Sequence, residues 1–455
     1  MATTEFGAAR VSRRLMPVAL PVCGRHFFAI LLAVWLFAGN KPSAALEPGH
    51  APIASGLGEL KGRLIVGYQG WFGCPEDIPG NMRWEHWFFK NNPGVDNLAV
   101  DLLPSVGQFR AEDLCATQLR RADGLPIKVF SSQNARVVAT HFRWMRDHGI
   151  DGAAVQRFVG PLATPELKQR SDRVLLNARA AAEANERVFY VTLDVSGADT
   201  NTVVTDIRRD WQYLVGDLRI TASPRYLHAN GKPVLQLWGF GFKDRPGSPV
   251  AVTKLIAELK ASATLIGGVP ANWRTLDGDS QSDRRWAEAY RRYDVLSPWS
   301  VGRFQDDAGI DNFVRERVLP DMAETKSLGI AYMPVVFPGF SWFNLQRGRG
   351  QNKLAILNQI PRRCGNFLWR QISALLAARV DILYAAMFDE VDEGTALFPT
   401  EAREEKLPKG GQMSFLNQDG CALPDDWYLR ITGKAAYYLR RNEAPPARLD
   451  AVMRP

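Results

Sequence analysis

Four carboxylates crowd into the run MFDEVDEGT, which covers residues 387–395. They are Asp389, Glu390, Asp392 and Glu393, and they follow the apolar stretch ILYAAMF. Such a stretch is typical of a buried strand in a barrel wall rather than of a solvated acidic turn. Like charges packed at the end of a buried strand raise one another's pKa, which keeps a carboxyl group protonated at neutral pH as a general acid. The run therefore predicts acid-base chemistry.

Glu390 and Glu393 stand three residues apart, so their Cα atoms lie under about 7 Å apart in a turn or about 10 Å apart in an extended chain. Their carboxyl groups match either the roughly 5 Å separation of retaining glycosidases or the roughly 6.5–9.5 Å separation of inverting ones. The spacing leaves the stereochemical outcome open. A carboxylate cluster is also a natural calcium ligand set. A calcium-stabilised barrel with its chemistry elsewhere is therefore an alternative, although we expect no cofactor and no metal at this site.

The segments that must position these acids alternate between short apolar runs and longer stretches of helical character from residue 64 onward. This alternation is typical of strand-helix units around a parallel sheet. The predicted strands are residues 64–69, 151–158, 188–195, 233–240, 264–270, 294–300, 331–338 and 381–390. The predicted helices are residues 135–148, 171–185, 203–218, 252–261, 282–291, 312–328, 364–378 and 433–440, with Gly149 and Gly329 at C-terminal cap positions.

Eight parallel strands, each followed by a helix, predict an α/β fold of the (β/α)8 or TIM barrel type. Long βα loops after the first, seventh and eighth strands account for the length beyond a minimal barrel. A doubly wound open sheet is the rival architecture, but it usually carries a glycine-rich phosphate turn after its first strand. The run YQGWFG separates its glycines by two bulky aromatic residues. We therefore predict one undivided domain.

The active site of such a barrel lies at the carboxyl ends of the strands, where the βα loops converge. The predicted ends carry aromatic rings that can stack on the C–H faces of sugars, and amides, arginines and carboxylates that can bind hydroxyl groups. This mixture predicts a carbohydrate cleft, although core packing is the alternative for each tryptophan. The predicted substrate-binding residues are Tyr68, Gln69, Trp71, Arg157, Asp194, Trp238, Trp299, Arg303, Trp342, Asp389 and Asp392.

Arg157 and Arg303 both follow predicted strands. They can meet an acidic sugar substituent, or they can form ion pairs with the acidic run. We expect the ion pairs.

Residues 1–45 have the order of a secretory signal: a basic flank, the apolar stretch FFAILLAVWLFAG, and small residues that place cleavage near Ala44 or Ala45. An uncleaved membrane anchor is the alternative, but the apolar stretch is short for a span that needs about 20 residues. We therefore expect a secreted or periplasmic protein whose residues 46–455 form the catalytic domain. We expect no stable membrane span after cleavage.

Charge and cysteine content bound the partners further. Removing residues 1–45 leaves 51 Lys and Arg against 47 Asp and Glu, a net charge of +4 with no basic block. Nucleic-acid binding rests on clustered phosphate contacts, so it is excluded as an expected function. Four cysteines remain after cleavage, at positions 74, 115, 364 and 421. An oxidising compartment then predicts at least one disulfide, with the pairing open.

The run DEVDEGT resembles the NEWHEGT signature that ends the last barrel strand of glycoside hydrolase family 99, the endo-acting α-mannosidases and α-mannanases. GYQGWFG at residues 67–73 resembles that family's first-strand motif, and FPGF at residues 337–340 resembles its strand-seven exit. The chain is also similar to bacterial and fungal family 71/99-like proteins, described as xylosidase/arabinosidase, in the stretches YQGWFG, HFRWMRDHGIDG, SPWSVGR, VVFPGFSW and MFDEVDEGTA.

This resemblance implies a carbohydrate substrate, with Glu390 and Glu393 as catalytic residues of a retaining route through a 1,2-anhydro sugar. Glu390 would take the proton of the sugar 2-hydroxyl, while Glu393 would protonate the leaving oxygen and later activate water. The Trp and His between the family's glutamates are Val391 and Asp392 here, and its preceding Asn is Asp389. Mannose specificity is therefore not carried over. A carbohydrate-binding barrel without catalysis is the alternative from another functional class.

Overall fold

The computed structural model of the chain describes residues 59–454, so the predicted signal segment at residues 1–45 lies outside the described residues. Its main sheet has ten strands in the order β10-β9-β8-β7-β5-β4-β1-β12-β11, with β6 beside β7. The strands are β1 (Leu64–Tyr68), β4 (Gly152–Phe158), β5 (Val188–Asp194), β6 (His228–Ala229), β7 (Lys232–Trp238), β8 (Thr264–Val269), β9 (Val295–Pro298), β10 (Ala331–Tyr332), β11 (Val335–Val336) and β12 (Leu383–Ala385).

The sheet closes on itself because β10 and β11 are two parts of one predicted strand. β10 pairs with β9, whereas β11 pairs with β12, and both pairings are parallel. The chain between them stays in the wall: Met333 N–H donates to Leu296 at 2.8 Å, and the carbonyl of Pro334 accepts from Tyr384 at 3.0 Å. Proline has no N–H to give to a ladder, which explains the interruption. Eight strand positions thus form a closed ring, and the predicted (β/α)8 barrel is confirmed.

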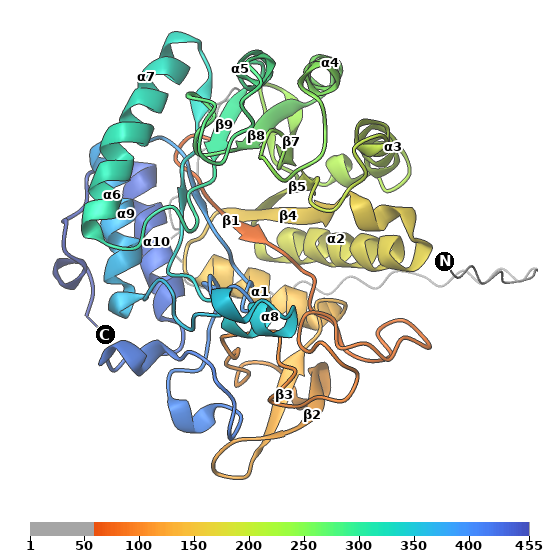
Figure 1. Cartoon of the computed structure of the whole chain (residues 1–455), viewed down its shortest axis with the longest axis vertical. Coiled ribbons are helices and arrows are strands. Elements are labelled where there is room, and N and C mark those ends of the chain that lie inside the picture. The colour runs from red at the N-terminus through yellow and green to blue at the C-terminus, as the bar shows by residue number, and fades with distance from the viewer. Residues whose placement is uncertain (1–58, 455) are drawn as a thin grey trace, which may run out of the picture. The chain divides into compact units, whose positions relative to one another are not determined.

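The helices alternate with the strands and surround the sheet (Figure 1). They are α1 (Ala135–Asp147), α2 (Pro165–Asn185), α3 (Val203–Gly216), α4 (Pro249–Leu259), α5 (Arg285–Tyr290), α6 (Asp307–Phe313), α7 (Leu319–Ser327), α8 (Phe343–Gly348), α9 (Asn366–Ala377) and α10 (Trp427–Arg441). Gly149 and Gly329 have φ angles of 70° and 68°, as expected for residues that end α1 and α7. Among residues 59–454 no helix is both long and apolar enough to span a membrane.

Several helix bounds differ by a few residues from the prediction, and α10 begins at Trp427 rather than at residue 433. Two further differences, in α2 and α6, have a local cause. α2 begins at Pro165, six residues before the predicted start, because proline at the first turn fixes a helical φ and gives up an N–H that has no partner there. The predicted helix at residues 312–328 begins earlier, as α6, and reaches α7 through a π-helical turn at Val314–Val318. Neither change moves a strand end.

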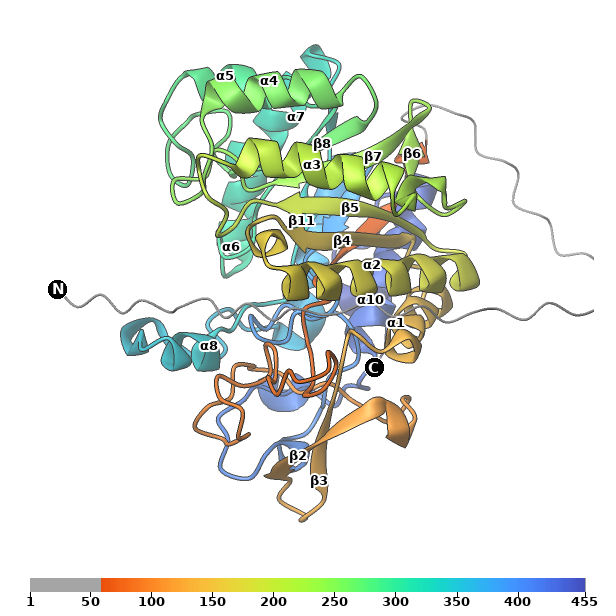
Figure 2. The same cartoon turned by 90° about the vertical axis from the view of Figure 1, so that its right-hand side faces the viewer.

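The excursion after β1 contains a hairpin that the sequence analysis missed. β2 (Leu114–Arg120) and β3 (Pro126–Phe130) pair antiparallel before α1 begins, and Figure 2 shows them projecting below the barrel. Their residues alternate between buried and exposed over only a few positions, and that short pattern lies inside a long polar excursion. The sequence pattern that indicates this hairpin is therefore weak.

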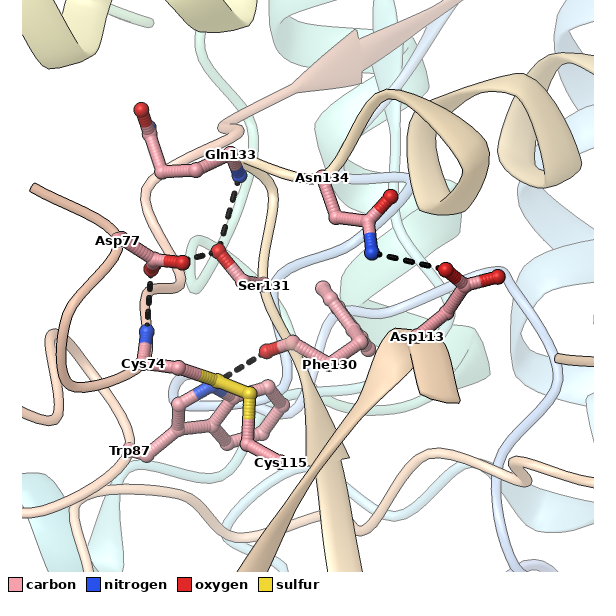
Figure 3. Close-up of a disulfide and its surroundings, with 9 residues drawn as sticks. All are labelled: Cys74, Asp77, Trp87, Asp113, Cys115, Phe130, Ser131, Gln133 and Asn134. Atoms are coloured by element: carbon pink, nitrogen blue, oxygen red, sulfur yellow. Dashed lines mark hydrogen bonds between the residues drawn. A yellow bond between two sulfur atoms is a disulfide. The ribbon is translucent and has the colours of Figure 1, made fainter. Parts of the chain in front are cut away.

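A disulfide between Cys74 and Cys115 ties this hairpin to the β1 exit (Figure 3). Around it, the Trp87 indole donates to the carbonyl of Phe130 at 2.9 Å, and Asp77 accepts from the Cys74 N–H at 2.5 Å. A second disulfide joins Cys364 and Cys421, near the start of α9 and in the excursion after β12. The prediction of at least one disulfide is confirmed, and each bridge fastens an excursion to the barrel.

The eighth strand is shorter than its apolar sequence predicts. β12 ends at Ala385 rather than at residue 390. The following residues still contact both neighbouring strands, because Ala386 N–H donates to Val336 at 2.8 Å and Phe388 N–H donates to Gly67 at 2.7 Å. The acidic run therefore leaves the barrel from between β1 and β11.

We predict that replacing both Cys74 and Cys115 by Ala lowers the free energy of unfolding by about 4 kcal/mol, because the bridge closes a loop of 41 residues in the unfolded chain. Urea unfolding followed by tryptophan fluorescence measures this change. A Gln118→Ala variant at an exposed position of β2 is the control and should unfold like the wild type. An unchanged midpoint in the double cysteine variant would contradict the prediction.

Candidate active site

The register of neighbouring strands sets their carboxyl ends at one level. Phe158 at the end of β4 pairs with Asp194 at the end of β5, and Asp194 pairs with Trp238 at the end of β7. Trp238 in turn lies opposite Gly268 of β8. A Cβ atom at Gly268 would lie 2.3 Å from the Trp238 ring, so only glycine leaves room for this indole. Register and a missing side chain thus place a phenyl ring, a carboxyl group and an indole along one rim.

A cleft of about 530 Å³ opens at these strand ends, within the range of roughly 300–1,000 Å³ that ligand pockets occupy. Ten of the sequence-predicted site residues line it: Gln69, Trp71, Asp194, Trp238, Trp299, Arg303, Trp342, Glu390, Asp392 and Glu393. Further lining residues were not predicted as site residues, among them His86, Gln156, Phe158, Ser196, Phe242, Asp244, Arg245, Phe340, Arg349 and Gln359.

Glu390 lines this cleft, and its carboxyl group is held on both sides. One oxygen accepts a hydrogen bond from Gln69 Nε2 at 2.7 Å, and the other accepts from the Thr395 hydroxyl at 2.5 Å. Glu390 is 5% exposed. Burial, followed by repulsion from Glu393 and Asp392, raises the pKa of Glu390 well above its usual value. The two hydrogen bonds fix its direction and oppose this shift.

Glu393 is partly exposed and lines the cleft beside Glu390. Its carbonyl accepts from Ser341 N–H at 2.9 Å, which fixes its backbone against the loop after β11. Burial and then repulsion from Asp392 raise the pKa of its carboxyl group, while Arg349 and Arg245 lower it. Glu390 and Glu393 are therefore neighbouring carboxyl groups that resist being ionised together. Such a pair holds a proton near neutral pH, which is the state that general acid catalysis needs.

Asp389 does not face the cleft. Its two carboxylate oxygens accept hydrogen bonds from the backbone N–H groups of Gln69 and Gly70, each at 2.8 Å, and the side chain is fully buried. Burial raises the pKa of Asp389 to about 7 even though both hydrogen bonds lower it. The prediction that Asp389 binds substrate is wrong, because its oxygens are used to fasten the β1 exit to the chain after β12.

Asp392 connects the acid pair to the excursion after β1. One of its oxygens contacts His86 Nδ1 at 3.1 Å, and the other is buried with no partner among the described residues. His86 stacks on Trp71 with ring centroids 4.2 Å apart, and Trp71 also stacks on Phe158 at 5.5 Å. Trp71 thus lines the cleft as part of an internal stack.

Two other predicted side chains point away from the cleft. Tyr68 is fully buried, and its hydroxyl contacts Nδ1 of His141, so the prediction of a sugar platform at Tyr68 is wrong. Arg157 is 1% exposed and binds Asp210 through Nε at 2.6 Å and Nη2 at 2.7 Å. Successive residues of a strand point to opposite faces. Because Gln156 faces the cleft, Arg157 must face the helices, where α3 carries its partner Asp210.

The expected ion pairs between the arginines and the acidic run are also wrong. Arg157 pairs with Asp210 and Asp172 instead, and Arg303 pairs with Asp279 at 2.8 Å. Arg303 still lines the cleft, on the side of β9.

The cations that act on Glu393 are Arg245 and Arg349, which the sequence analysis missed. Arg245 follows β7 and lies over the Trp238 ring at 5.8 Å. Arg349 follows α8, whose position is set by Asp101: this buried carboxylate accepts from the N–H groups of Phe343 at 2.6 Å and Asn344 at 2.8 Å. Strand alternation could have identified Gln156 and Phe158. No local pattern announces His86 or Arg349, because their positions depend on how the excursions fold.

No group of three or more His, Cys, Asp or Glu side chains within residues 59–454 is arranged to hold a metal ion. The acids after β12 instead bond to an amide, a hydroxyl, backbone N–H groups and an imidazole.

Comparison with solved structures identifies the architecture. The chain is similar to a GH99 endo-alpha-mannosidase from Bacteroides thetaiotaomicron in complex with BIS-TRIS-propane, with a TM-score of 0.60 and 16% identity over 84% of this chain and 98% of that chain. Another structure of the endo-alpha-mannosidase from this organism gives a TM-score of 0.60 and 15% identity over 84% and 99% of the two chains. No protein-family model and no curated protein matches the sequence. The resemblance predicted from the motifs is confirmed at the level of structure: this chain is a (β/α)8 barrel with the fold of a family 99 glycoside hydrolase.

Proposed function

We propose that the protein is a glycoside hydrolase that uses Glu390 and Glu393 to cleave glycosidic bonds in an oligo- or polysaccharide. The observation that carries this proposal is the adjacent pair of acids with raised pKa at one end of an aromatic-lined cleft. The two disulfides support a function in an oxidising compartment, in agreement with the secreted or periplasmic location that the N-terminal sequence predicts.

The environments of the two acids suggest different roles. Glu390 accepts hydrogen bonds from Gln69 and Thr395, which stabilise its anion and suit a base that takes the proton of the sugar 2-hydroxyl. The deprotonated 2-oxygen then attacks the anomeric carbon and forms a 1,2-anhydro sugar. Glu393 gives its proton to the leaving oxygen as the glycosidic bond breaks. The Glu393 anion afterwards removes a proton from the water that attacks the anomeric carbon, and Glu390 returns its proton to the 2-oxygen as the anhydro ring opens. Arg245 and Arg349 stabilise that anion.

The remaining lining supplies the two kinds of contact that a sugar needs. Trp238 and Trp299 meet edge to face with ring centroids 5.3 Å apart, so they present differently oriented rings to the cleft. The indole N–H groups of Trp238 and Trp342 are buried without a partner among the described residues, and each can donate to a sugar hydroxyl. Asp194 accepts from Ser196 N–H at 2.7 Å and lines the cleft, where its carboxylate can also accept from a sugar hydroxyl. These residues are the proposed sugar-binding set.

Replacing Glu393 by Gln should lower kcat by about 10²- to 10⁴-fold, because the amide retains the shape but cannot transfer the proton. Replacing Glu390 by Gln should cause a loss of similar size, since the 2-hydroxyl then has no base. Release of reducing sugar from a panel of α- and β-linked glycans measures both. Glu404→Gln, at an exposed position remote from the cleft lining, is the control and should retain wild-type activity.

Full activity in either cleft variant would sink the assignment of that residue. If the wild type binds glycans across the panel and cleaves none of them, the alternative of a carbohydrate-binding barrel is favoured instead.

The carboxylate of Asp392 raises the pKa of both glutamates, so its removal should change the pH dependence of activity in a defined direction. In Asp392→Asn, the pKa of Glu393 should fall because a neighbouring negative charge is lost. A general acid works only while protonated, so activity disappears as pH rises through its pKa. The alkaline limb of kcat/KM against pH should therefore move to lower pH in this variant. Profiles of the wild type and Glu404→Gln, which should coincide, provide the comparison; a limb that stays in place or moves to higher pH contradicts this role of Asp392.

A further inference from the structure

A second chamber of about 390 Å³ adjoins the cleft and lies between the β1 exit and the N-terminal half of α2. Its lining includes Trp71, Phe158, Leu162, Leu167, Arg170 and Val174. Neither glutamate of the acid pair belongs to this lining. The chamber is thus a separate space next to the reacting groups, and its volume is enough for a ligand portion.

The cleft and the chamber share one wall. Gln69, Trp71, His86, Gln156 and Phe158 line both spaces. Gln69 also donates to Glu390, so the shared wall begins at the acid pair. A ligand bound over Glu390 therefore has the chamber directly beside it.

Polar atoms without partners mark this shared wall. Gln69 and Gln156 are each 8% exposed, and the Oε1 atom of each is buried without a hydrogen bond among the described residues. The indole N–H of Trp71 is buried and unpartnered in the same way. Native proteins pair nearly all buried polar groups, so two free acceptors and a donor here indicate a ligand with hydroxyl groups. A sugar ring over Glu390 supplies them.

Away from this shared wall the chamber is lined by several apolar side chains. Pro161, Leu162, Leu167 and Val174 form its far side, and Val174 is 5% exposed. A second sugar ring pushed against these side chains would lose hydrogen bonds to water without replacing them, which costs free energy for each buried hydroxyl.

Three polar side chains near this apolar side are engaged, whereas Gln133 Oε1, which also lines the chamber, is buried without a partner among the described residues. Arg170 contacts Glu85 at 3.4 Å, and the Ser171 hydroxyl accepts from Arg157 at 3.0 Å. An apolar group would bury its surface against the leucines and the valine.

We propose that the chamber binds an apolar ester-linked substituent, an acyl or aroyl group, carried by the sugar that sits over Glu390. The assignment rests on the proposed glycosidase function for its position, but not for its chemistry. Specificity then comes from two features: hydroxyl contacts at the shared wall, and burial of the substituent between Phe158 and Leu167.

The first test is direct binding of methyl benzoate to the full chain, measured by ligand-observed NMR. The wild type should bind this ester in the millimolar range expected for a small fragment. Leu167→Trp fills the partly exposed mouth of the chamber and should weaken binding at least about tenfold through steric exclusion. The control is Leu176→Trp, the same substitution on the same helix at a residue that is 41% exposed and outside the chamber lining.

Retained affinity in Leu176→Trp, together with loss in Leu167→Trp, supports the proposal. Equal binding by both variants, or no binding by the wild type up to the solubility limit, overturns it. The Glu393→Gln variant should bind methyl benzoate like the wild type, so this test is independent of catalysis.

The second test compares kcat/KM on an esterified polysaccharide before and after mild alkaline de-esterification. The wild type should prefer the esterified form, and Leu167→Trp should reduce that preference while Leu176→Trp keeps it. Equal hydrolysis of the two forms by the wild type overturns the chamber assignment and leaves the glycosidase proposal standing. Absence of hydrolysis on either form counts against the glycosidase proposal, and the binding test then decides the chamber alone.

Discussion

The carboxylate of Asp389 holds the first and last strands of the barrel in the relation on which the site depends. Its two oxygens accept from consecutive backbone N–H groups, those of Gln69 and Gly70, in a fully buried position. Losing such an acceptor would leave two buried donors unpaired, at a cost of about 1–3 kcal/mol each. Because these two hydrogen bonds fix the backbone of Gln69, they also position its side-chain amide, which binds Glu390. Asp389, which precedes Glu390, is therefore a structural residue.

The charged groups of the site come both from the barrel strands and from the long loops that connect them. The carboxyl groups of the acidic run lie at the end of the barrel wall, since this run follows β12 directly. Groups from elsewhere in the chain contact them: His86 from the excursion after β1 contacts Asp392, while Arg245 after β7 and Arg349 after α8 lower the pKa of Glu393. Crowded carboxyl groups raise one another's pKa, and nearby cations limit that rise. Burial is the largest cause of the raised pKa of both glutamates, and loops that are remote from the pair in sequence then adjust the pKa of Glu393.

The barrel architecture could be predicted because its signals are local. An apolar run indicates each strand, and hydrophobic periodicity and caps indicate each helix. The eight strand positions can therefore be predicted without knowing how the strands pair. The errors have equally physical causes. A proline splits the seventh strand at Pro334, and β12 is short although its apolar sequence continues to Phe388. The hairpin β2–β3 lies in a long excursion where few residues alternate, so its signal was weak.

The sequence by itself determined the fold class and the place of the acid pair, because a buried apolar strand followed by E-x-x-E depends only on neighbouring residues. It did not determine which strand-end side chains face the cleft. Tyr68 and Arg157 looked like ligand contacts, yet both point into packed surroundings where His141 and Asp210 satisfy them. The tertiary structure alone decided the disulfide pairing, the contact of His86 with Asp392, and the chamber behind Trp71. Each of these joins segments far apart in the chain, and such contacts follow from the paths of the excursions rather than from any local pattern.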